Sequence, residues 1–189
     1  MPRAPPHPNG FTRPWSYEQV GLIAIEVLVT VLFCSGMYFD SDKVRVEEPS
    51  IAYLAVLMVR LLTYVDLGMH DSSSSSLDFP CISKRKFEDR YCSKCKKMVP
   101  GLDHHCSWLN TCVGKSNYGR FLLVVTLGVV LHLVHVGYGA YFSFVVDGGG
   151  CWSWYLVLAL GATLFGSCTS LISFHIYLLW VGMTTYEWT

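Results

Sequence analysis

Four runs of apolar residues, separated by polar stretches, dominate the chain. The first covers residues 19–39, about 21 residues, which at roughly 1.5 Å each cross a hydrocarbon layer of about 30 Å as one helix. A weaker run at 51–67 is interrupted by Arg60 and closed by Asp66, so that alone it also fits a buried helix of a soluble protein. Longer runs cover residues 121–146 and 152–183. The pattern predicts an all-α membrane protein with four transmembrane helices, the second crossing being favoured by its place between a span and a basic segment.

The polar stretches set the expected domain boundaries. Residues 1–18 hold four of the eight prolines before residue 9 and no apolar run, which predicts a disordered arm and no secretory signal. Residues 68–120 form a hydrophilic segment between the second and third spans. Its serine run at 72–76 is typical of a flexible linker, with a regulatory phosphorylation site as the alternative. Polar turns at 40–50 and 147–151 join the other spans, and residues 184–189 follow the fourth.

Composition and charge support this membrane topology. The chain has 189 residues, of which 52% are hydrophobic and only 15% are charged, so a soluble single domain is the less favoured class. The net charge is zero, but nine of the 14 Lys and Arg residues fall between residues 84 and 120. Basic loops stay in the cytosol, so the central segment and both termini are expected there. The turns at 40–50 and 147–151 are then expected in a lumen or outside the cell.

Ionisable residues inside the predicted spans need partners. Glu26 and Arg60 lie at matched depth in antiparallel spans, and we predict an ion pair between them; the alternative is that Arg60 extends alone to the interface. His132, His135 and His175 are interpreted as hydrogen-bonded interior histidines rather than cofactor ligands. Trp152 and Trp154 are interpreted as interfacial anchors.

The segment between the second and third spans concentrates residues that bind metal ions. Six ligands compete there for the four places of a structural zinc ion: Cys92, Cys95, His104, His105, Cys106 and Cys112. In a reducing compartment, a CxxC with a downstream His and Cys is more typical of a metal site than of a disulfide. Pro100 and Gly101 are expected to turn the chain back so that a histidine and Cys112 complete the site.

This ligand set leaves two questions open. Adjacent side chains of an extended segment point to opposite sides, so His104 and His105 are not expected on the same ion, but the pattern does not say which one binds. A site of four cysteines that uses Cys106 competes. In the favoured assignment a Cys/His pair is left over beside Asp103, which is the composition of an activated thiol nucleophile.

The same residues carry a resemblance to a known family. Asp103-His104-His105-Cys106, followed by Ser107-Trp108, Asn110, Cys112-Val113-Gly114, Asn117 and Phe121, resembles the core of the DHHC protein S-acyltransferases, or palmitoyltransferases. The order of two spans, a cytosolic cysteine-rich segment and two spans fits as well. Thr184-Thr185-Tyr186-Glu187 resembles the TTxE motif of that family. The resemblance covers nearly the whole chain beyond the N-terminal arm.

The resemblance implies a role for each residue. Cys106 would accept the acyl group, with His104 as its base and Asp103 orienting that base, while Thr185 would lie near Asp103. Cys92, Cys95, His105 and Cys112 would bind one structural zinc ion. The implied reaction moves a long-chain acyl group, in particular palmitoyl, from acyl-CoA through an acyl-cysteine to cysteine thiols of membrane-associated proteins. The expected location is a Golgi, ER or plasma membrane, with lipids and no nucleic acid as partners.

Some features depart from the family pattern. The second zinc site usual in the family would need a histidine and a cysteine where this chain has Tyr91 and Met98, and only Cys81 remains upstream. We therefore predict one zinc ion. The proline common after the motif is Ser107, and the sequence ends at Thr189, which fits a minimal or a truncated form. The alternative function is an inactive membrane-embedded zinc module that binds partner proteins.

No residue is assigned to the acyl-CoA head group. Basic residues of the central segment are candidates for its phosphates, with contacts to lipid head groups as the alternative: Arg90, Lys94, Lys96, Lys97 and Lys115.

Overall fold

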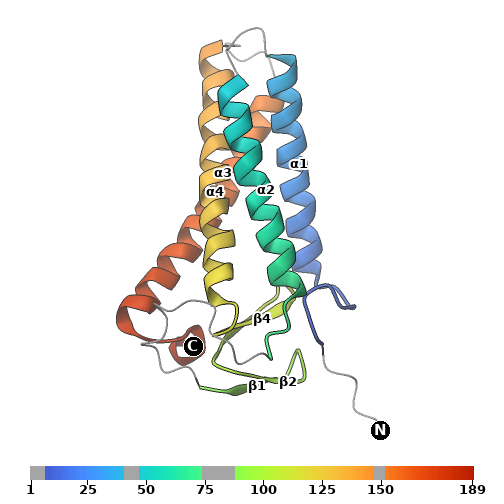
Figure 1. The fold of residues 1–189 in the computed structure, drawn as a ribbon. Helices are drawn as coiled ribbons and strands as arrows, with labels where there is room; N and C mark the ends of the chain where they lie inside the picture. The colour runs from blue at the N-terminus through green and yellow to red at the C-terminus, as the bar shows by residue number, and fades with distance from the viewer. Residues whose placement is uncertain (1–6, 41–46, 74–87, 147–151) are drawn as a thin grey trace. The chain divides into compact units, whose positions relative to one another are not determined.

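Figure 1 shows the computed structural model, which describes residues 7–40, 47–73, 88–146 and 152–189. The elements follow the chain in the order α1 (Tyr17–Phe39), α2 (Glu47–Met69), β1 (Arg90–Cys92), β2 (Lys97–Val99), β3 (Leu102–Cys106), β4 (Thr111–Gly114), α3 (Tyr118–Tyr141), a π-helical segment (Phe142–Val146), α4 (Trp152–Val181) and α5 (Thr185–Trp188). Cys81, most of the serine run and the whole of the predicted turn at 147–151 lie outside the described residues, as do residues 41–46 of the turn predicted at 40–50.

The four long helices match the predicted spans. Each is long and apolar enough to cross a membrane, over Tyr17–Phe39, Ile51–Met69, Tyr118–Val146 and Trp152–Val181. The predicted all-α membrane fold with a cysteine-rich segment between its second and third helices is therefore confirmed. The helices α1 and α3 begin a few residues before the apolar runs. The Ser16 hydroxyl accepts a hydrogen bond from the Gln19 amide (3.0 Å), so a polar cap, which the apolar pattern does not mark, starts α1.

The helices contribute to two compact units, which are described separately. The helical unit comprises residues 21–61 and 125–171, and the cysteine-rich unit comprises residues 1–20, 62–124 and 172–189. The helical unit contains the larger part of each of the four long helices, which Figure 1 labels α1 to α4. The cysteine-rich unit contains all four strands and α5.

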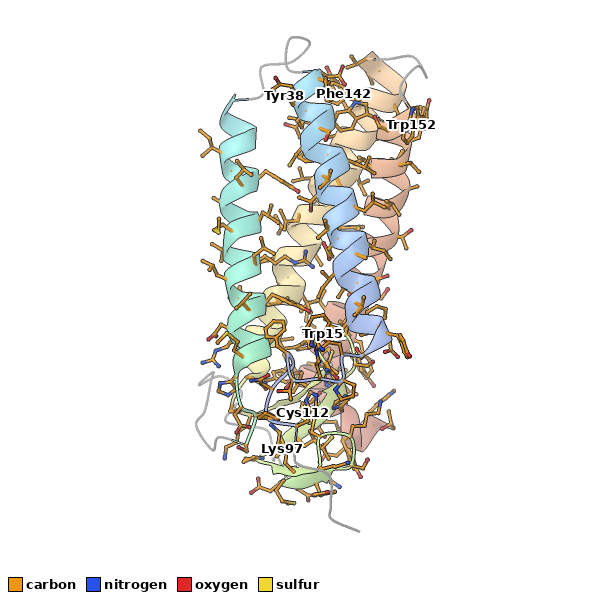
Figure 2. The ribbon with its side chains drawn as sticks, turned by 90° about the vertical axis from the view of Figure 1, so that its right-hand side faces the viewer. Trp15, Tyr38, Lys97, Cys112, Phe142 and Trp152 are labelled. Carbon is orange, nitrogen blue, oxygen red and sulfur yellow. The ribbon has the colours of Figure 1, made fainter. Side chains whose placement is uncertain are left out.

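The core of the helical unit is aromatic. Phe142 and Trp154 stack with their ring centroids 4.4 Å apart, and Phe33 meets Trp154 edge-on at 6.2 Å. Trp154 is fully buried, and its indole N–H donates to Asp40 Oδ2 (2.8 Å). The interpretation of Trp154 as an interfacial anchor is therefore wrong, because Asp40 satisfies its polar group inside the unit. Trp152 is exposed, and it lies with Phe142 at one end of this unit (Figure 2).

A chain of polar side chains links the helices inside this unit. Arg60 donates two hydrogen bonds to the Glu26 carboxylate, at 2.8 and 2.7 Å. His132 Nε2 lies 3.2 Å from Glu26 Oε1, and its Nδ1 lies 3.3 Å from Nδ1 of His135. The Tyr53 hydroxyl lies 2.9 Å from His135 Nε2. The predicted Glu26–Arg60 pair and the hydrogen-bonded interior histidines 132 and 135 are confirmed.

Two antiparallel hairpins build the cysteine-rich unit. In the first, β1 pairs with β2 so that Cys92 lies opposite Lys97; in the second, β3 pairs with β4 so that His105 lies opposite Cys112. Gly101 joins the hairpins with a φ of 59°, a conformation that glycine adopts without strain, so the chain reverses at the predicted Pro100-Gly101 turn. The buried core of the hairpins is small and consists of Cys92, Cys95, Val99, Leu102 and Cys112.

The N-terminal arm packs against these hairpins. The His7 amide donates to the Cys95 carbonyl (2.8 Å), and the Gly10 amide donates to the Gly68 carbonyl (2.7 Å). The Asn110 side chain donates to the carbonyls of Gly10 and Pro14. The prediction of a disordered arm over residues 1–18 is therefore wrong for residues 7–16, because main-chain groups distant in sequence hold them; residues 1–6 lie outside the described part.

Candidate functional site

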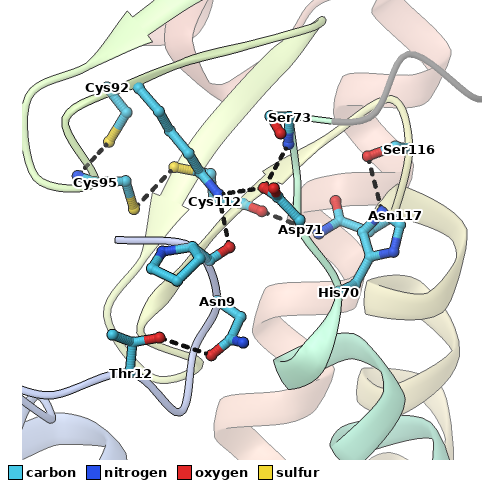
Figure 3. Close-up of polar contacts among 12 residues, drawn as sticks. Asn9, Thr12, His70, Asp71, Ser73, Cys92, Cys95, Cys112, Ser116 and Asn117 are labelled. Atoms are coloured by element: carbon cyan, nitrogen blue, oxygen red, sulfur yellow. Dashed lines mark hydrogen bonds and ion pairs between the residues drawn. The ribbon is translucent and has the colours of Figure 1, made fainter. Parts of the chain in front are cut away.

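The hairpins bring four metal-binding side chains together. Cys92 ends β1, Cys95 lies in the following turn, and His105 and Cys112 face each other across β3 and β4. Their ligand atoms all lie within 4.8 Å of one another. The Cys95 amide also donates to Cys92 Sγ (3.4 Å), a contact that favours a thiolate at Cys92. Figure 3 shows the sulfur atoms of Cys92, Cys95 and Cys112 converging between the hairpins.

The spacing of these donors fits a zinc ion. Tetrahedral zinc with Zn–S bonds of about 2.3 Å and a Zn–N bond of about 2.0 Å places its donor atoms roughly 3.5–3.8 Å apart. His105 Nδ1 lies 3.7, 3.3 and 3.8 Å from the sulfurs of Cys92, Cys95 and Cys112, and the sulfurs of Cys95 and Cys112 are 3.3 Å apart. Three thiols and one imidazole are also a common donor set for structural zinc.

The two adjacent histidines of β3 point to different groups. His105 contacts the three sulfurs, whereas His104 Nδ1 lies 2.9 Å from Asp103 Oδ2. Among the described residues, Cys106 does not belong to the four-residue metal cluster. It follows His104 by two positions and is buried at the end of β3. The structure thus groups His105 with the cysteines and sets His104 and Cys106 apart.

Thr185 makes two hydrogen bonds to the Asp103 carboxylate. Asp103 is fully buried and accepts hydrogen bonds from the Thr185 amide to Oδ1 (3.2 Å) and from the Thr185 hydroxyl to Oδ2 (2.6 Å). Thr185 is the first residue of α5, whose capping box joins Thr184 and Glu187. The expected contact between Thr185 and Asp103 is therefore confirmed, and the capping box explains why the Thr-Thr-x-Glu spacing positions it.

Electrostatics favour a proton on His104. Burial disfavours the charged imidazolium, but the hydrogen bonds to Asp103 and Cys106 outweigh it and raise the pKa of His104 to about 9. Burial also disfavours the Asp103 carboxylate, yet its hydrogen bonds from His104 and Thr185 hold its pKa below the ordinary value. A histidine with this pKa, anchored by a carboxylate, retains a proton that it takes from a thiol.

Tyr118 and His175 also lie at this site, which the sequence did not predict. The Tyr118 hydroxyl lies 2.9 Å from Nδ1 of His175, and the His175 ring packs 5.6 Å from that of His104. His175 is hydrogen-bonded and interior, as predicted, but its place beside His104 was not expected. The only signal in the sequence is its position nine residues before Thr184, and helix and turn geometry must be known to interpret that spacing.

Tyr91 and Met98 occupy the positions where a second zinc site would need a histidine and a cysteine. They lie directly opposite each other in the β1–β2 hairpin, and both side chains are exposed. Neither is a good ligand for zinc, which is bound by thiolate, imidazole and carboxylate groups, and a thioether is a soft neutral donor. Two of the basic candidates have partners: Lys97 pairs with Asp71 (2.7 Å), and Arg90 pairs with Glu88 (2.6 Å).

Known proteins are similar to this chain in sequence. A family model described as DHHC palmitoyltransferase matches residues 72–189. The chain is 36% identical to palmitoyltransferase SWF1 of Eremothecium gossypii over 57% of this chain and 32% of that protein. It is 27% identical to palmitoyltransferase erf2 of Emericella nidulans over 95% of this chain and 34% of that protein. It is 28% identical to probable protein S-acyltransferase 15 of Arabidopsis thaliana over 57% of this chain and 44% of that protein.

The chain spans less than half the length of each of these relatives. The family match includes the two hairpins, α3, α4 and α5, whose Thr185 donates to Asp103. The protein therefore belongs to the DHHC palmitoyltransferase family.

Proposed function

We propose that this protein is a protein S-acyltransferase that uses Cys106 as its nucleophile. The observation that carries the proposal is the place of Cys106 in β3, two residues after His104 and outside the four-residue metal cluster. His104 Nδ1 lies 2.9 Å from Asp103 Oδ2, Thr185 in turn donates to Asp103, and the interaction with Cys106 helps to raise the pKa of His104. A free thiol beside a carboxylate-bound histidine is the arrangement of an activated nucleophile.

The first half of the reaction loads the enzyme. His104 takes the proton of Cys106, and the thiolate attacks the carbonyl carbon of a long-chain acyl-CoA. A new C–S bond forms, the C–S bond to CoA breaks, and the CoA thiolate leaves with the proton from His104. Asp103 keeps the imidazole oriented and stabilises its positive charge. One thioester replaces another, so no additional energy source is needed.

The second half transfers the acyl group to a protein. A substrate cysteine thiol gives its proton to His104 and attacks the acyl-Cys106 carbonyl, which releases Cys106. The acyl chain, in particular palmitoyl, has an affinity for the membrane hydrocarbon of about 0.8 kcal/mol per CH₂. Cysteines of membrane-associated proteins are therefore the proposed substrates. We place Cys106 and both chain termini on the cytosolic side of an endomembrane or plasma membrane, since the basic residues of the central segment favour that orientation.

Zinc has a structural part in this proposal. Cys92, Cys95, His105 and Cys112 would hold one ion, which when bound cross-links the two hairpins. The hairpins have only a small buried core, so they need such a cross-link to keep β3, and with it Asp103, His104 and Cys106, in place.

The test is acylation of the purified full chain with labelled acyl-CoA. Label on the wild type that hydroxylamine removes, and that Cys106→Ser lacks, is the expected result. A wild type that is folded and zinc-loaded but takes up no label would overturn the proposal and favour a non-catalytic zinc module.

A further inference from the structure

A second histidine lies beside the Asp103–His104 pair. His175, on α4, is 1% exposed, and one of its ring nitrogens, one of His104 and a carboxylate oxygen of Asp103 all lie within 4.8 Å of one another. We propose that His175, held by Tyr118, is a positioning residue that fixes the His104 ring for the reaction at Cys106. The inference rests on the proposed acyl transfer.

Tyr118 fixes the orientation of His175. Its hydroxyl lies 2.9 Å from His175 Nδ1, and both side chains are buried, at 0% and 1% exposure. When the phenol donates this bond, Nδ1 is the acceptor, and the proton of the neutral imidazole resides on Nε2. A partner of this kind sets both the rotation and the tautomer of a histidine ring. The orientation of the His175 ring is therefore fixed.

The His104 ring is packed between His175 and Phe121. His175 packs against it at 5.6 Å between ring centroids, and Phe121 packs at 5.3 Å with an interplanar angle of 72°. Phe121 and His175 also contact each other at 4.9 Å. The bond to Asp103 holds only Nδ1, about which the imidazole can still tilt. The packing of His175 and Phe121 restricts that tilt and so fixes the direction in which the other ring nitrogen points.

A histidine suits position 175 better than an apolar ring does. A phenylalanine would fill similar space but would remove the acceptor that Tyr118 uses here. It would also put a purely apolar edge near the buried Asp103 carboxylate, where Thr185 and His104 already provide polar contacts. Buried charges are retained when polar groups surround them. Losing the polar ring is thus expected to loosen both Asp103 and His104.

Four variants of the full chain test the proposal. His175→Phe keeps the ring but loses the bond, Tyr118→Phe removes only the hydroxyl, and His175→Gln restores a polar partner without the ring. Tyr177→Phe is the matched control, since Tyr177 lies two residues along α4 and is 40% exposed. The measurements are the first-acylation rate constant at saturating acyl-CoA, the half-saturating acyl-CoA concentration, zinc content, and the rate at which iodoacetamide alkylates Cys106.

The expected result is a loss in rate alone. His175→Phe should lower the acylation and alkylation rates about 10- to 100-fold and Tyr118→Phe about 3- to 10-fold, since misplacing a general base by a fraction of an ångström has effects of this order. His175→Gln should recover part of the loss. Half-saturation and zinc content should stay within about twofold of wild type, and Tyr177→Phe should match wild type.

Several results would overturn the inference. Wild-type rates in both His175→Phe and Tyr118→Phe would do so, as would losses that follow zinc content or folded yield in each variant, which indicate a purely structural role. Should His175→Phe not fold, Tyr118→Phe decides. Absence of acylation in the wild type would overturn the proposed function instead, and the alkylation rates would then still decide whether His175 positions His104.

Discussion

At the scale of single residues, the alternation of side chains along β3 separates metal binding from chemistry. His105 faces the three cysteines, while His104 and Cys106, on either side of it, face away from them. The alternation of an extended segment predicted that the two histidines would not share an ion. It could not assign them, because the assignment depends on the register that pairs His105 with Cys112 and on the irregularity in pairing at Asp103. Both are tertiary features.

This separation predicts opposite effects of two serine substitutions. Cys106→Ser should abolish acylation while zinc content and thermal stability stay near wild type, because the thiol is outside the metal cluster. Cys112→Ser should lose zinc first and acylation as a result. Zinc analysis and acylation of both purified variants measure this, and loss of zinc from Cys106→Ser would show that Cys106 is a ligand.

At the scale of elements, the long apolar helices were predictable and the N-terminal arm was not. A helix that spans a membrane can be predicted from one continuous run of apolar residues, as for α1 and α4. The arm is held by contacts such as that between His7 and Cys95, 88 positions apart, which no local pattern contains. Its prolines limit backbone conformations, but such residues are compatible with a packed segment as well as with a disordered one.

The fit of the arm predicts a cost for any side chain at Gly10. A Cβ atom there would clash with the Leu109 carbonyl oxygen, a main-chain atom that cannot move aside easily. Gly10→Ala should lower the free energy of unfolding by about 1–3 kcal/mol, as overpacking does. Gly21→Ala is the control, because a Cβ there meets nothing within 4 Å. Thermal unfolding in detergent should rank the two, and equal midpoints would show that the arm is not packed in this way.

The ion pair between α1 and α2 predicts strong coupling. Glu26→Gln and Arg60→Gln should each lower the free energy of unfolding by roughly 3–5 kcal/mol, and the double change by little more, because either single change takes away the two-bond partner of a charged side chain that is at most 19% exposed. The exposed Arg90–Glu88 pair should show coupling of only about 0–1 kcal/mol. Double-mutant cycles measure both energies. Additive losses at Glu26 and Arg60 would mean that the two groups do not interact.

At the scale of the whole molecule, the protein should bind one zinc ion. One complete ligand set is present among the described residues, and the positions of two ligands expected for a second site carry Tyr91 and Met98. Metal analysis should give about one zinc per chain, unchanged in Cys81→Ser and lost in Cys95→Ser. A reproducible value near two would contradict this prediction.

The close approach of Cys95 and Cys112 has a consequence for the oxidation chemistry of the protein. Their sulfurs are 3.3 Å apart, so two thiols freed by a chelator can give up two electrons to an added oxidant such as diamide and join as a disulfide. The joined sulfurs no longer bind zinc as thiolates. Chelated protein treated with diamide should then take up zinc only after dithiothreitol is added, and equal uptake without dithiothreitol would contradict this. A protein that loses its zinc under oxidising conditions would thus stay without zinc until a reductant breaks the disulfide.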